Sequence, residues 1–186
     1  MGKVLSAIDD TARRFIEAQK IFFVASAPLA PEGHVNLSPK GLDTFRILGP
    51  TTVAYIDFNG SGVETIAHLG EENNGRIVLM FCAFQGPPDI FRLYGKGRVV
   101  EPQNPEFAEL AEKFPAHDTI RSIIVVELTR VTDSCGYGVP LFKYEGEREQ
   151  LKKWARKQGA EGLKAYRERK NKHSIDGRPG LPGLAG

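Results

Sequence analysis

The first two-thirds of the chain consist of short apolar runs separated by turn-forming residues. The runs are rich in Val, Ile, Phe and Tyr, which favour strands, and clusters of Gly, Pro and Asn separate them. Most connections are too short to hold a helix, so successive strands are expected to run antiparallel. The pattern predicts six strands, at residues 21–27, 34–38, 51–58, 76–84, 90–100 and 122–133.

Helical spacing marks the two ends of the chain and one internal segment. Residues 4–19 repeat apolar side chains every three or four positions, which predicts an amphipathic helix. Residues 105–114 predict a second helix, with Asn104 as its cap and Pro115 as its stop signal. Beyond Tyr144 the spacing is again helical and is interrupted by glycines.

These elements predict a mainly β fold with flanking helices, of the α+β class. The six antiparallel strands are expected to close into a small barrel. We expect a domain over residues 1–144, a helical extension over 145–173, and a final segment over 174–186 that is either a disordered tail or an arm on a neighbouring surface. The apolar residues that favour an arm are Ile175, Leu181 and Leu184.

Composition narrows the function. The chain has 25 Lys and Arg against 23 Asp and Glu, a net charge of +2, and the surplus lies in residues 148–173, where glutamates are interleaved. We therefore expect neither nucleic acid nor a membrane as partner, and a cytoplasmic location. The two cysteines and four histidines lack ligand spacing, so no metal site is predicted.

A glycine-flanked serine, Gly60-Ser61-Gly62, separates one predicted strand from a helix-like run. Free backbone N–H groups at such a turn can hold an anion, although a capped tight turn has the same sequence. Glu64 follows after Val63 and would have to point away from a bound anion. Without a ligand it could pair with Arg92 or Lys40.

Two basic residues are candidates for the cation that such an anion needs. Lys40 follows a strand that also carries Asn36, at a place where strand ends of a small barrel come close. Arg92 shares a strand face with Ile90 and Tyr94, so its charge needs either a protein partner, such as Asp57 or Glu64, or an anionic ligand.

The order of these motifs, from SPKG through YIDFNGSG and GRIVLMF to RLYGKGRV, resembles the pyridoxamine 5'-phosphate oxidase-like group of FMN-binding split barrels. The resemblance covers roughly residues 8–133. It implies a homodimer with FMN in a groove between the chains, an oxidoreductase activity and an unidentified small substrate. The residues that it assigns to the cofactor are Asn36, Ser38, Lys40, Asp57, Asn59, Ser61, Gly62, Thr65 and Arg92.

The chain also departs from that family. True pyridoxamine phosphate oxidases carry basic residues after the serine of the turn, where this chain has Gly62, Val63 and Glu64. Oxidation of pyridoxamine phosphate itself is therefore not expected. Two alternatives stay open, a related reductase that uses the deazaflavin F420 and a dimeric barrel that has lost its flavin and acts as a binding protein.

Overall fold

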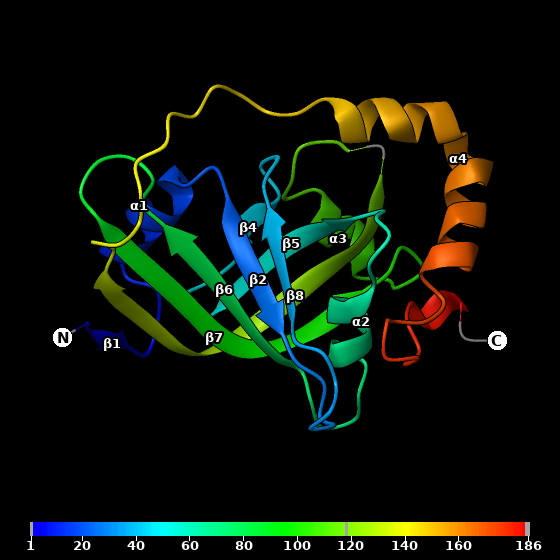
Figure 1. Ribbon diagram of the computed structural model, residues 1–186, viewed down its shortest axis with the longest axis horizontal. Helices are drawn as coiled ribbons and strands as arrows, with labels where there is room; N and C mark the ends of the chain where they lie inside the picture. The colour runs from blue at the N-terminus through cyan, green and yellow to red at the C-terminus, as the bar shows by residue number, and fades with distance from the viewer. Residues whose placement is uncertain (1, 118, 185–186) are drawn as a thin grey trace.

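A computed structural model describes residues 2–117 and 119–184. The helices and strands follow one another along the chain as shown in Figure 1. In chain order they are β1 (Val4–Leu5), α1 (Asp10–Ala18), β2 (Phe22–Ser26), β3 (Asn36–Lys40), β4 (Phe45–Ile47), β5 (Thr52–Phe58), α2 (Glu64–Leu69), β6 (Arg76–Cys82), β7 (Asp89–Val100), α3 (Phe107–Ala111), β8 (Ile120–Cys135), α4 (Gln150–Lys170) and the 3-10 turn η1 (Pro182–Leu184).

One antiparallel sheet curls into a half-barrel. Its strand order is β3-β2-β6-β7-β8-β5-β4, and β1 pairs with β8 outside this path. The mainly β class and the antiparallel pairing agree with the sequence analysis, but the strand number and the closed barrel do not. The described residues form eight strands instead of six, because β1 and β4 are too short to stand out as apolar runs. No ladder joins β3 to β4 in the described part of the chain, so the sheet stays open there.

The helix predicted over residues 4–19 is shorter than expected. The side chain of Asp9 accepts a hydrogen bond from the Ala12 N–H and starts α1, while Val4 and Leu5 pair with β8 instead. Ala12 and Ile16 then face the main core. The helix predicted over 105–114 is also shortened, to the five residues of α3.

The core has two parts on the two faces of the sheet. The concave face of the half-barrel buries large side chains such as Val24, Tyr55, Leu79 and Leu93, and α1 and α2 pack against it. A smaller cluster on the other face of β5 and β8 includes Ile56 and is covered by α3. Burial on both faces explains why β5 and β8 read as continuous apolar runs.

The C-terminal third returns to the barrel. Residues 136–149 cross above the sheet without regular structure, and α4 then runs down the side of the molecule toward α2 (Figure 1). Gly159 has φ 64° and ψ 179°, so α4 is two helices joined at a kink. After α4, Leu181 packs into the main core with 3% of its surface exposed. Residues 185–186 of the predicted final segment lie outside the described residues.

Among the described residues, helices that combine the length and the apolar character needed to cross a bilayer are absent.

Replacing Leu181 tests how much this final segment contributes to stability. Leu181→Ala removes a side chain from the main core, so we expect the free energy of unfolding to fall by about 2–3 kcal/mol in a denaturant titration. Ile175→Ala is the matched control in the same segment. Ile175 is 70% exposed, so its loss should change stability by less than about 0.5 kcal/mol. Equal effects of the two substitutions would show that the segment does not contribute to the core.

Candidate functional site

Buried side chains hold the turn between β5 and α2, residues 59–63, by donating hydrogen bonds to its carbonyl oxygens. Arg121 donates to the carbonyl oxygens of Gly62 (2.8 Å) and Gly60 (3.3 Å), and the side-chain amide of Asn171 also donates to Gly60 (2.9 Å). Val63, the residue before α2, makes no side-chain cap. The N–H groups of Ser61, Gly62 and Val63 donate no hydrogen bond within the described residues, so they stay available to a ligand.

Arg121 reaches this turn because of an irregularity in β8. Asp57 pairs with Ser122 across the sheet and Phe58 pairs with Ile120, so Arg121 has no cross-strand partner. Such a bulge redirects the side chain of the extra residue. The sequence analysis did not identify Arg121. The available signal was a charged residue directly before the apolar run at residues 122–126, where a buried charge requires a partner.

Asp57 lies between two cations. Its Oδ1 accepts a hydrogen bond from Lys40 Nζ at 2.9 Å, and its Oδ2 accepts from Arg121 at 2.6 Å and 2.8 Å. Burial by itself would raise the pKa of Asp57, but Lys40 and Arg121 outweigh it and lower the pKa. The group of one carboxylate and two cations therefore carries one excess positive charge.

The inward side of β3 connects this charged group to α2. Asn36, Ser38 and Lys40 alternate along the strand and share the face that Phe22, Val24 and Ser26 present on β2. The side-chain amide of Asn36 donates to Thr65 Oγ1 at 3.0 Å, and the Ser38 hydroxyl donates to Asn36 Oδ1 at 3.3 Å. β3, the end of β5 and the first turn of α2 thus meet at one place.

Asn59 and Ser61 occupy the turn in different ways. Asn59 is buried, donates to the Thr119 carbonyl oxygen at 2.8 Å and accepts from Arg167 at 3.2 Å. Its contacts fix the turn to the start of β8 and to α4. Ser61 and Gly62 are exposed, so they are the part of the turn that an incoming molecule would meet first.

Glu64 does not pair with Lys40 or Arg92. Its Oε1 accepts a long hydrogen bond, 3.3 Å, from the N–H of Ile175 in the final segment. Its Oε2 lies beside Gly62, since a Cβ atom added there would approach it to 2.5 Å. The carboxylate therefore stands next to the exposed part of the turn.

Arg92 lies apart from the other predicted site residues. It pairs with Met80 across the sheet, and Met80 pairs with Phe23, which pairs with Pro39. This row is on the opposite face from Lys40. Arg92 donates to the Ser134 hydroxyl at 2.9 Å. The prediction of Asp57 or Glu64 as its protein partner is wrong. Asp57 accepts from Arg121, and Glu64 accepts from the N–H of Ile175 in the final segment.

One of the buried residues of α2 is a histidine, His68. The ring of His68 is fully buried, and its Nδ1 lies 2.9 Å from the Ser26 hydroxyl. Burial lowers the pKa of His68, which favours the neutral imidazole. The described residues contain no cluster of three or more His, Cys, Asp or Glu side chains placed to hold a metal ion.

Comparisons with known proteins point to one family. Residues 8–135 match the sequence profile described as pyridoxamine 5'-phosphate oxidase. The chain is 38% identical over 192 residues to the pyridoxamine 5'-phosphate oxidase family protein ustO of Aspergillus flavus, covering 94% of this chain and 76% of that protein.

Two solved structures share the fold at low sequence identity. The HupZ protein of Group A Streptococcus superposes with a TM-score of 0.53 at 19% identity, over 68% of this chain and 99% of that one. A protein of Lactobacillus delbrueckii described as a putative pyridoxamine 5'-phosphate oxidase gives a TM-score of 0.51 at 13% identity, over 68% and 94%. With the profile match and the ustO relative, the conclusion is that this chain belongs to the pyridoxamine 5'-phosphate oxidase family.

Proposed function

We propose that the protein binds FMN, with the phosphate at the turn formed by Gly60, Ser61 and Gly62, and acts as an oxidoreductase on a small substrate. The observation that carries this proposal is the excess positive charge of the group formed by Lys40, Asp57 and Arg121. A partly buried cation without a full counter-charge is unfavourable unless an anion balances it. A phosphate at the adjacent turn would supply that balance.

The donors around the turn suit a phosphate. Arg121 is committed to Asp57 and to the turn carbonyls, so it shapes the site from beneath. Lys40 gives one hydrogen bond to Asp57, and an ammonium has three donors, so it keeps donors for a ligand. The Ser61 hydroxyl and the free N–H groups of the turn add neutral donors, which together with Lys40 match the acceptor-only oxygens of a phosphate.

A bound flavin would supply the redox chemistry, and the protein would position it and exclude water. In this proposal Asn36 and Ser38 line the flavin on β3, and Thr65 orients Asn36. Arg92 is too far around the sheet to act in its own chain, so we assign it to the groove of a partner chain. The cofactor groove would then lie between two copies, as the family resemblance implies.

The position of Glu64 favours a second candidate, a dimeric barrel that has lost its flavin and serves as a binding protein. A carboxylate beside Gly62 repels a phosphate and must rotate away before one binds. Absorbance of the purified protein separates the two candidates. A flavin spectrum supports the first, and a colourless protein that ignores added FMN supports the second. F420 remains a variant of the first and has a distinct absorbance.

Lys40→Ala should weaken FMN binding far more than Lys96→Ala. Losing one charge-assisted contact in a partly buried site costs about 1.5–3 kcal/mol, which is roughly a tenfold to hundredfold rise in Kd. Lys96 donates to the Asn74 carbonyl oxygen instead, so it serves as the control. Quenching of flavin fluorescence gives both affinities. Equal values would reject the role of Lys40.

Ser61→Ala and Glu64→Gln should act in opposite directions. Removing the Ser61 hydroxyl should weaken FMN binding by about tenfold, the value of one hydrogen bond to a charged group. Glu64→Gln removes a repulsion of up to about 4 kcal/mol at 4 Å separation, so affinity should stay the same or rise. The reverse ranking in the same titration would mean that the turn is not a phosphate site and that Glu64 holds a ligand itself.

Sedimentation should show a homodimer, two chains of 20.5 kDa. The reason is the apolar exterior of the edge strand β3, where Leu37 is 64% exposed, beside Val35 at 71%. Leu37→Glu should shift the protein toward monomer, and Ile175→Glu, at an equally exposed position on the final segment, should not. A wild-type monomer at micromolar concentration, unchanged by FMN, would contradict this part of the proposal.

A further inference from the structure

One side of α4 faces the turn between β5 and α2. Leu163, Arg167 and Asn171 are spaced four residues apart, so their side chains lie on the same side of the helix. Leu163 is 7% exposed and Asn171 is fully buried, so this side is turned toward the barrel. The side-chain amide of Asn171 donates to the Gly60 carbonyl oxygen, and the end of α4 approaches α2 (Figure 1). Arg167, between the two buried residues, is thereby held at the turn.

Arg167 is a partly buried cation whose donors are mostly uncommitted. Within the described residues its side chain gives one hydrogen bond, from Nη1 to Asn59 Oδ1 at 3.2 Å, and forms no ion pair. A guanidinium has five N–H donors, so most of its hydrogen-bonding capacity is left for another molecule. A cation that is partly removed from water without a counter-charge favours the binding of an anion.

Asn59 sets the direction in which Arg167 points. Asn59 is 2% exposed, and its side-chain amide and its backbone N–H both donate to the Thr119 carbonyl oxygen, at 2.8 Å and 3.1 Å. These bonds fix the position of Oδ1, which then anchors one N–H of the guanidinium. Asn59 is the first residue of the turn, directly before Gly60. The guanidinium therefore lies at the start of the turn.

The charges around the turn make a further cation necessary for an anion to bind. Lys40, Asp57 and Arg121 together carry one excess positive charge, but the Glu64 carboxylate beside the turn cancels it. The turn supplies no cation of its own, because each of its residues is uncharged. Arg167 brings the total back to one positive charge. An anion at the turn thus meets a net positive site only when Arg167 is counted.

We propose that Arg167 is the second cation of the phosphate site and donates to the phosphate oxygens of the cofactor. The inference rests on the proposed binding of FMN at the turn. It assigns a ligand contact to the C-terminal extension, the chain beyond residues 8–135 that match the family profile. Lys40 on β3 and Arg167 on α4 hold the phosphate from two separate elements. The extension is then part of the binding site as well as a support for the turn.

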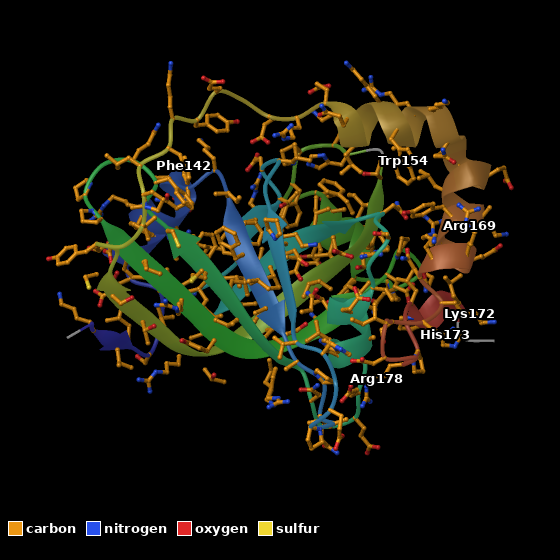
Figure 2. The ribbon with its side chains drawn as sticks, in the orientation of Figure 1. Phe142, Trp154, Arg169, Lys172, His173 and Arg178 are labelled. Carbon is orange, nitrogen blue, oxygen red and sulfur yellow. The ribbon has the colours of Figure 1, made fainter. Side chains whose placement is uncertain are left out.

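Titration with FMN, followed by quenching of flavin fluorescence, tests the contact on the full chain. Arg167→Gln keeps an amide donor but removes the charge, so Kd for FMN should rise about tenfold to hundredfold, as for loss of a charge-assisted hydrogen bond. Arg169→Gln is the matched control. Arg169 is exposed, its guanidinium lies over the Tyr166 ring at 5.7 Å, and Figure 2 labels it at the outer edge of α4. Equal effects of the two variants would overturn the assignment.

Riboflavin, which lacks the phosphate, separates loss of a phosphate contact from damage to the fold. Arg167→Gln should bind riboflavin as tightly as the wild type does, because the lost contact involves only the phosphate. Retained riboflavin binding also shows that the variant is folded. A parallel loss of affinity for FMN and riboflavin would mean that Arg167 supports the groove in general, and would reject its role as a phosphate cation.

A lysine variant and the salt dependence separate direct contact from positioning through Asn59. Arg167→Lys keeps the charge but not the planar fork, so it should recover part of the affinity that Arg167→Gln loses. Added salt should weaken FMN binding less in Arg167→Gln than in the wild type, because one screened attraction is missing. A lysine variant no better than glutamine, with the salt dependence of the wild type in both, would show that Arg167 only orients the turn.

The same titrations distinguish failure of this inference from failure of the proposed function. A wild type that binds FMN with an affinity that Arg167→Gln does not change would overturn the role of Arg167 and leave FMN binding in place. A wild type that binds no FMN would contradict the proposed function, and the role of Arg167 with it.

Discussion

The buried ion pair between Arg121 and Asp57 is the interaction on which the candidate site depends. Both side chains are about 95% removed from solvent, and the guanidinium contacts one carboxylate oxygen and two backbone carbonyl oxygens. Removing Asp57 would leave two cations without a counter-charge inside the barrel, which is far more costly than loss of a surface pair. The pair also sets the orientation of Lys40, because Asp57 is its counter-charge. The turn, the strand end and β3 are thereby positioned by one electrostatic arrangement.

That arrangement follows from strand register. β5 pairs regularly with β8 from Thr52 to Asp57, and the bulge at Arg121 lies at the end of β5, between the pairs made by Asp57 and Phe58. A regular ladder would alternate the side chain of Arg121 to the other face, toward α3, where the second core cluster is apolar. One extra residue thus changes which core receives the charge. Acid should also destabilise the site. The pKa of Asp57 is lowered in the folded protein, so the stability that its ionised carboxylate contributes to folding is present above the ordinary carboxyl pKa and is lost as the pH falls through the lowered value.

The sequence predicted the parts of the fold that depend on local pattern. Six main strands and the antiparallel pairing follow from composition and alternation. Lys40 was expected in the turn after the strand at 34–38, but it lies within β3, on the same side as Asn36 and Ser38. The bulge does not follow from alternation, because it arises from pairing between distant strands, and Arg121 was missed with it. The alternation along β7 correctly placed Ile90, Arg92 and Tyr94 on one face of the strand. The side chains on neighbouring strands that Arg92 contacts depend on the order of strands in the sheet, which the alternation does not give. The partners of Glu64 depend on a final segment more than a hundred residues away.

The C-terminal extension bears on the site as much as the family domain does. Arg167 reaches Asn59 and Asn171 reaches Gly60, so two positions of the extension contact the turn. The N–H of Ile175 reaches Glu64, the first residue of α2. Each of these contacts is made by a segment outside the family profile. The extension therefore helps to fix the turn, together with Arg121 and Thr119, and holds the Glu64 carboxylate beside it. Relatives that share the half-barrel but lack this extension must fix the same turn by other contacts, so the affinity of the turn for an anion can differ among proteins whose barrels are alike.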